Sequence, residues 1–130
     1  MSAHFHAIVW IDHQSARIFS FNRESSTQQD IKSHEESHIH HKAGSVGAGH
    51  VHEGHAYLKT VADALSAYHE ILITGPGAVK TELMSYLAQY APETAKHVLG
   101  VETLDHPTDN EIMAFARKRF VGIDHMTPQR

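Results

Sequence analysis

Short apolar runs near the start of the chain predict β-strands. Residues 5–11 read FHAIVWI and residues 16–21 read ARIFSF, and runs of this length that are rich in β-branched and aromatic residues are typical of strands. Between them, residues 12–15 read DHQS, a composition that favours a tight turn. The two strands should therefore pair as an antiparallel hairpin.

A more polar stretch follows the hairpin. Residues 22–29 are predicted to form a loop. Residues 30–42 are predicted to be extended, as an edge strand or a hairpin arm, because Ile31 and Ile39 are their only large apolar residues. One face of such a strand would be well solvated.

The hydrophobic period changes to that of a helix at about His55. Four apolar residues spaced i, i+3, i+4 and i+7 form the stripe that an amphipathic helix buries. They are Leu58, Val61, Ala62 and Leu65.

A strand and a second helix are predicted next. The apolar run 71–74 indicates a buried strand that ends at Gly75-Pro76-Gly77, a sharp break. The helix after it should stop before Pro92, with a short helical turn through Lys96. Its apolar face consists of Leu83, Tyr86, Leu87 and Tyr90.

The last two elements are a strand at residues 98–104 and a final helix. Thr108-Asp109-Asn110-Glu111 matches a capping box, the pattern that opens a helix. The apolar residues that follow are Ile112, Phe115 and Ala116.

This order of elements predicts an α/β fold. Strands joined through helices should run parallel through right-handed crossovers, while the N-terminal strands are antiparallel. We expect a ribonuclease H-like mixed sheet with antiparallel N-terminal strands and three main helices. With 130 residues, the chain has the size of a single domain, 1–130.

Composition narrows the classes of function. The chain has no cysteine, which excludes disulfides, thiolate zinc sites and thiol nucleophiles. No stretch reaches the ~20 apolar residues of a membrane span, and the N-terminus lacks a secretory pattern, so we expect a cytoplasmic protein without membrane contact. Because the formal net charge is −4, RNA binding would need a local basic patch.

Histidine is concentrated in one stretch: residues 34–55 hold seven of the fourteen histidines. Unperturbed imidazole titrates near ~6.5, so the surface charge should depend strongly on pH. His38 and His40 share one face of a strand, and His52 and His55 are one turn apart on a helix. These four are a candidate Zn²⁺, Ni²⁺ or Cu²⁺ site. The alternatives are a solvated histidine-rich strand and a pH-dependent contact in a homo-oligomer.

The same stretch contains small residues, and we expect a flexible His/Gly-rich loop at about 41–54. Glycines permit positive φ and a close approach to a backbone, which suits a binding loop; a simple connector is the alternative. As a binding loop, its contact residues would be Lys42, Gly44, Ser45, Gly47, Gly49 and His50.

Four segments, in this order, carry a resemblance to a known family: AIVWIDHQSARIFSF, HIHHKAGSVGAGH, EILITGPGAVKTELMSYL and VETLDHPTDNEI. Over nearly its whole length the chain resembles the middle domain of the eukaryotic and archaeal class 1 release factors and of pelota. In particular, it resembles the bacterial stand-alone version of that domain, the translational machinery component family. The resemblance implies the mixed α/β fold and the ribosome or RNA as partner.

Release factors of this family carry a Gly-Gly-Gln motif in the loop before the first helix, where it promotes hydrolysis of peptidyl-tRNA. Here residues 42–50 read KAGSVGAGH, with neither a Gly-Gly pair nor a glutamine. The resemblance therefore implies a non-catalytic, translation-associated factor rather than an enzyme. The alternative function is a histidine-rich metal- or pH-responsive binding protein, with Zn or Ni as its candidate metal.

Two enzyme-like patterns have simpler explanations. Asp12, with Glu102, Asp105 and Asp109, would suit a two-Mg²⁺ nuclease, but Asp12 equally suits a hairpin turn. Residues 75–81 resemble a nucleotide-binding loop that lacks the glycine required before the lysine.

Basic and aromatic groups also have structural explanations. Arg117-Lys118-Arg119 is typical of a solvated last helical turn. Four aromatic residues with aliphatic neighbours predict packing in the core or in an interface rather than base stacking. They are Tyr86, Tyr90, Phe115 and Phe120.

Overall fold

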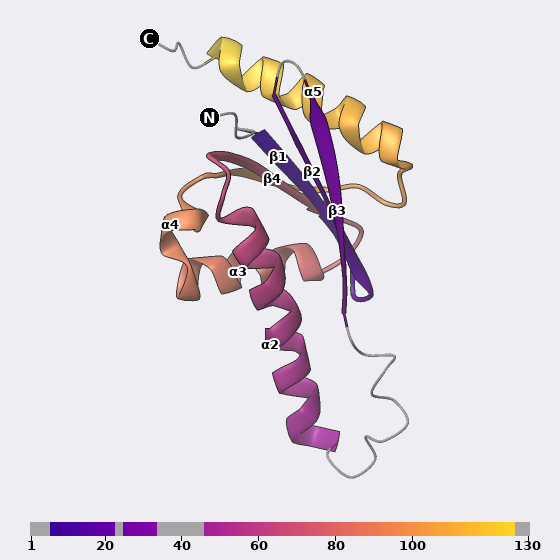
Figure 1. Cartoon of the computed structure of the whole chain (residues 1–130), viewed down its shortest axis with the longest axis vertical. Helices are drawn as coiled ribbons and strands as arrows, with labels where there is room; N and C mark the ends of the chain where they lie inside the picture. Colours follow the sequence, from indigo (N-terminus) through magenta and orange to yellow (C-terminus); the bar gives the residue numbers. More distant parts are fainter. Residues whose placement is uncertain (1–5, 23–24, 34–45, 127–130) are drawn as a thin grey trace.

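The computed structural model describes residues 6–22, 25–33 and 46–126, and for residues 46–55 and 122–126 it describes the backbone alone. Figure 1 shows α5 on one face of a sheet and α2 with α3 on the other. None of the described helices combines the length and apolar composition that a membrane span requires. The elements are β1 (His6–Ile11), β2 (Ser15–Phe21), β3 (Ser26–Lys32), α2 (Val46–Leu65), β4 (Glu70–Gly75), α3 (Val79–Tyr90), α4 (Pro92–Ala95), β5 (Val98–Thr103) and α5 (Asp109–Met126).

The strands form one sheet of five in the order β3-β2-β1-β4-β5. β2 pairs antiparallel with both β1 and β3, whereas β4 pairs parallel with both β1 and β5. The predicted mixed α/β sheet with antiparallel N-terminal strands is confirmed, and so are the three main helices α2, α3 and α5, with α4 as the short helical turn.

The predicted loop at residues 22–29 is wrong from Ser26 onward, because β3 begins there. The side chains from Ser26 to Asp30 are all exposed, so no apolar pattern marks this half of the strand. Backbone hydrogen bonds to β2 hold it in place, and these do not depend on side-chain type. β3 is an edge strand, as predicted, with Ile31 buried; residues 34–42 of the predicted extended segment lie outside the described residues.

The predicted flexible loop at about 41–54 is wrong from Val46 onward, since α2 begins at that residue. Residues 46–56 are mostly glycine, alanine and histidine, so the sequence shows no apolar period typical of a helix there. Once the stripe from Tyr57 to Leu65 is packed, however, lengthening the helix adds one hydrogen bond per residue without a second nucleation cost. None of the described glycines has a positive φ, so those within α2 adopt ordinary helical geometry. Residues 41–45 lie outside the described residues.

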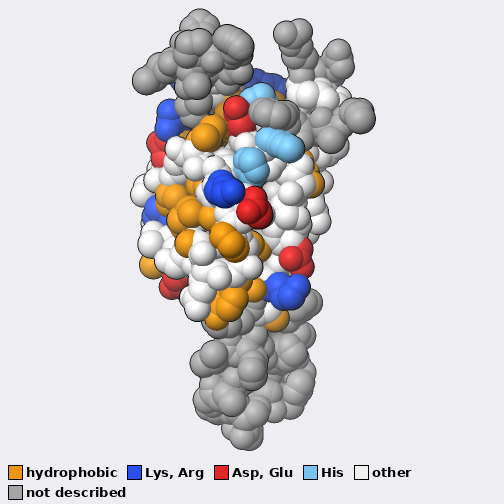
Figure 2. Space-filling view, turned by 90° about the vertical axis from the view of Figure 1, so that its left-hand side faces the viewer, with side chains coloured by type: hydrophobic (Ala, Val, Ile, Leu, Met, Phe, Trp, Pro, Cys, Tyr) orange, Lys and Arg blue, Asp and Glu red, His pale blue; other side chains and the backbone are white. Residues whose placement is uncertain are grey.

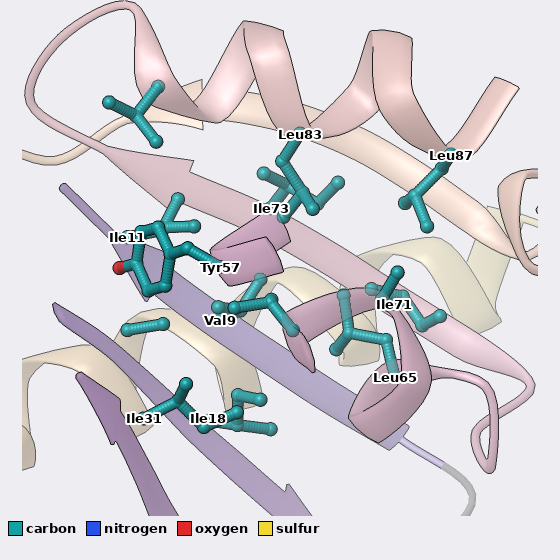
Figure 3. Packing of buried hydrophobic residues seen from close by; sticks show 14 residues of the cluster. Val9, Ile11, Ile18, Ile31, Tyr57, Leu65, Ile71, Ile73, Leu83 and Leu87 are labelled. Carbon is teal, nitrogen blue, oxygen red and sulfur yellow. The ribbon is translucent and has the colours of Figure 1, made fainter. Parts of the chain in front are cut away.

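The central strands divide their side chains between two hydrophobic clusters, because successive residues of a strand point to opposite faces. In β1, Val9 and Ile11 join the cluster beneath α2 and α3, while Ile8 and Trp10 join the cluster beneath α5. Figure 3 shows the first cluster, in which helix and strand side chains meet. Its members include Leu65, Ile71, Ile73, Leu83 and Leu87.

α5 opens with the predicted capping box. The backbone N–H of Thr108 donates to Glu111 Oε1 at 2.9 Å, and the N–H of Glu111 donates to Thr108 Oγ1 at 3.1 Å. This reciprocal pair satisfies donors that have no partner within the helix. The loop before α5 is tied to the sheet by Trp10, whose Nε1 donates to the carbonyl of Leu104 at 2.9 Å.

Candidate functional site

The residues predicted to contact a partner belong to two parts of the chain. Lys42, Gly44 and Ser45 lie outside the described residues. The backbone of Gly47, Gly49 and His50 lies in the first turns of α2. As far as the structure describes it, the candidate contact region is the start of a helix.

The start of α2 projects from the body of the protein. Tyr57 is buried, and its hydroxyl donates to the carbonyl of Asp12 at 3.0 Å, in the turn between β1 and β2. From Val46 to Tyr57 the helix rises by about 16 Å, at 1.5 Å per residue, and Figure 1 shows this half of α2 extending beyond the end of the sheet. The backbone of Gly47 and His50 therefore lies at the outer end of a projecting helix.

The four-histidine metal site stays a prediction. His38 and His40 lie outside the described residues, and His52 and His55 lie on α2, one turn apart, with only their backbone described. Over the described ranges, no three or more His, Cys, Asp or Glu side chains are grouped so that they could hold a metal ion.

The acids considered for a nuclease act in other ways. The carboxylate of Asp12 accepts two hydrogen bonds from backbone N–H groups of its own turn, at 2.9 and 3.0 Å, which confirms the turn interpretation. Glu102 accepts from Nε of Arg119 at 2.6 Å, and Asp109 contacts Nη1 of Arg17 at 2.6 Å. Asp12 thus stabilises its own turn, while Glu102 and Asp109 stabilise contacts between elements.

The residues at the end of β4 and in the following turn have structural roles. A Cβ at Gly75 would overlap the carbonyl oxygen of Ile11, at the end of the neighbouring strand β1. Lys80, the lysine of the superficial nucleotide-loop pattern, donates from Nζ to the carbonyl of Gly77 at 2.7 Å. The glycine at position 75 is therefore required by the close approach of two strand ends, and the lysine bonds to its own turn.

The basic cluster on α5 is not at the last helical turn, so this prediction is wrong in position: α5 continues to Met126. Ile123, three residues after Phe120, continues the apolar spacing of the helix past the basic cluster. Arg119 pairs with Glu102, and the guanidinium of Arg117 lies 5.5 Å from the ring centroid of Phe21. Lys118, between them, is exposed on the face of the sheet opposite α2.

Three of the four predicted packing aromatics pack against the core and one does not. Phe120, on α5, is buried in the hydrophobic cluster between α5 and the sheet, and Phe115 packs against that cluster. Tyr86 packs against the other cluster, whereas Tyr90 is 55% exposed, with its ring centroid 4.7 Å from that of Tyr86. Tyr90 does not pack in the core because it is the last residue of α3, beyond Leu87, the last buried residue of that helix, and for Tyr90 the interface alternative stays a prediction.

Arg17 makes a cluster that sequence reasoning missed. Its guanidinium lies 4.6 Å from the ring centroid of Trp10, and its Nη2 donates to the carbonyl of Pro107 at 3.2 Å, in addition to the contact with Asp109. The signal was present in the predicted hairpin, because a turn at residues 12–15 places Trp10 opposite Arg17. Such cation–π contacts add to stability when partly buried.

The described part of α2 carries one perturbed group. Lys59 donates from Nζ to Asp63 Oδ2 at 3.1 Å, and this hydrogen bond, with the charge of the carboxylate, raises the pKa of Lys59 above its usual 10.5. The lysine therefore stays charged at neutral pH.

The fold defines an α/β protein with a mixed five-stranded sheet between helices. No protein-family model matches the chain, and no curated protein matches its sequence. The solved structures that it matches include Pelota from Archaeoglobus fulgidus, with 15% identity over 92% of this chain and a TM-score of 0.63, and the archaeal translation termination factor aRF1, with 13% identity over 87% and a TM-score of 0.57.

A third structural match is Dom34 of S. cerevisiae, described as a translation termination-like factor involved in RNA quality control pathways, with 13% identity over 94% of this chain and a TM-score of 0.50. The chain spans only 32%, 34% and 39% of the Pelota, aRF1 and Dom34 chains. At these identities the likeness shows the fold, and it confirms the fold that the sequence resemblance implied.

Proposed function

We propose that this protein is a non-catalytic, translation-associated factor of the cytoplasm that binds the ribosome or RNA through residues 42–50. The observation that supports this most directly is the fold shared with one part of Pelota and of an archaeal translation termination factor. The segment in question reads KAGSVGAGH and contains no Gly-Gly-Gln. We therefore propose binding without peptidyl-tRNA hydrolysis.

The position of the helix supports the choice of contact region. The start of α2 extends beyond the sheet (Figure 1), so a large partner can approach it without meeting the body of the protein. The first N–H groups of a helix lack partners within the helix and favour anions such as phosphate. Lys42, close by in sequence, adds a positive charge, and glycines at positions 47 and 49 allow a nucleic-acid backbone to come near.

Sedimentation of the tagged protein from a cell lysate tests the proposal. The expected result is comigration with ribosomal particles at low salt that fades as salt rises, because contacts to phosphates release counterions. Lys42→Glu should weaken comigration, while Lys118→Glu, the same charge change on the exposed part of α5, should leave it intact. Wild-type protein found only at the top of the gradient at low salt would refute the proposal, and sensitivity to Lys118→Glu alone would move the contact to α5.

The histidine alternative gives a different result in the same assay. Replacing His38, His40, His52 and His55 with glutamine should leave comigration unchanged if residues 42–50 act through phosphate contacts. Loss of comigration on this replacement, together with an equal loss on adding a chelator, would favour the metal-responsive function instead.

A further inference from the structure

His69 and His97 lie side by side where two neighbouring parallel strands begin. His69 immediately precedes β4 and His97 immediately precedes β5. The N–H of Ile71 donates to the carbonyl of His97 at 3.0 Å, which fixes the two strand starts relative to each other. The two imidazole centroids are 5.3 Å apart and the ring planes are tilted by 60°. Figure 2 shows that several histidine side chains lie close together on one face of the molecule.

This separation is compatible with a metal ion shared by the two rings. A Zn–N bond of about 2.0 Å with tetrahedral angles places the centroids of two imidazoles on one ion about 5 Å apart. The observed 5.3 Å therefore needs little movement beyond ring rotation.

The surroundings admit an ion from solvent. His69 is exposed and His97 is partly exposed. The nearest charges along the chain are Glu70, which follows His69 and contacts Nε2 of His6 at 3.0 Å, and Lys96, which precedes His97 and pairs with Glu93 at 3.3 Å. Because the described residues supply no group of three ligands, water must complete the coordination shell.

We propose that His69 and His97 together bind one divalent transition-metal ion, Zn²⁺, Ni²⁺ or Cu²⁺, through one ring nitrogen each. The site is separate from residues 34–55 and independent of the proposed translational function. Its two ligands come from the starts of adjacent strands, so the bound ion would cross-link the beginning of β4 to the beginning of β5. Both imidazoles must be neutral to bind, so affinity falls in acid.

Nuclear magnetic resonance of the full chain, labelled at the histidine imidazoles and titrated with Zn²⁺, tests the site. Resolved ring signals separate this pair from the histidines of residues 34–55. The ring signals of His69 and His97 should shift together, at one common Zn²⁺ concentration. In His69→Gln the response of His97 should move to at least tenfold higher Zn²⁺, because the second ligand of a chelating pair acts at high effective concentration.

The control is His13→Gln, which removes an exposed histidine of the β1–β2 turn and should leave the response of both rings unchanged. The proposal is overturned if the two rings respond at different Zn²⁺ concentrations in the wild type. It is also overturned if His97 responds in His69→Gln as it does in the wild type. The wild-type titration decides the matter even if a substitution disturbs folding.

Discussion

The replacement Gly75→Ala tests the closest approach between two strands of this fold. The added Cβ would overlap the backbone carbonyl oxygen of Ile11. Because that oxygen belongs to the main chain, it cannot rotate away as a side chain would. β1 and β4 must therefore separate. This movement also disturbs the hydrogen bond that the N–H of Leu104 donates to the carbonyl of Gly75 at 3.0 Å.

The magnitude follows from overpacking. Inserting one carbon into a tightly packed site costs about 1–3 kcal/mol, and a main-chain neighbour places this site at the upper end. Replacing glycine also restricts the unfolded chain, which returns about 0.4–1 kcal/mol. We expect a net loss of roughly 2 kcal/mol in the free energy of unfolding, or a fall in Tm of roughly 8 °C for a domain of this size.

Gly77→Ala is the matched control, two residues away in the same turn. A Cβ at Gly77 would meet no atom within 4 Å, and its φ is not positive. It should leave stability unchanged or raise it by about 0.5 kcal/mol. Urea unfolding followed by circular dichroism measures both variants. If Gly75→Ala unfolds within about 0.5 kcal/mol of Gly77→Ala, the inferred clash is wrong.

Three further predictions concern the surface and the projecting helix. Arg17→Ala should lower the free energy of unfolding by about 1–2 kcal/mol in urea, mostly through lost packing, because the ion pair with the half-exposed Asp109 contributes less than about 1 kcal/mol; an unchanged midpoint would contradict this. Gly49→Ala should slow amide hydrogen exchange at the start of α2, since alanine favours a helix by about 1 kcal/mol, and faster exchange would argue against a helix there. Asp63→Asn should lower the pKa of Lys59 toward 10.5, seen by alkaline titration of its side-chain resonance. In the wild type this favourable contact is present below the unfolded pKa of lysine and is lost as pH rises through the raised folded pKa, and an unchanged pKa in the variant would refute the assigned cause.

Most elements of the fold were predictable because their patterns are local. The hairpin of β1 and β2, the stripe on α3 and the capping box of α5 each depend on residues close together in sequence. The two large errors have one origin. β3 from Ser26 to Asp30 and α2 from Val46 to Ala56 lack a clear apolar period, and both are defined by backbone hydrogen bonds that small or polar residues make as well as large ones.

The candidate sites were predictable to a smaller extent. Residues 42–50 and the four spaced histidines were found as stretches of unusual composition, which sequence displays directly. The cluster of Arg17 with Trp10 needed the hairpin register as well. The pair of His69 and His97 had no local signal, because each is a single histidine next to a strand.

The sequence by itself therefore determined the type and order of the main elements and the residues available for chemistry. Periodicity, turn residues and caps depend on a few neighbouring residues, so these patterns can be recognised without knowing how the rest of the chain folds. Only the tertiary structure decided which distant groups meet. It placed β4 next to β1 so tightly that position 75 must be glycine, and it brought His97 beside His69 through a parallel strand pairing. Such contacts depend on how strands are ordered in the sheet, which is a property of the packed core as a whole.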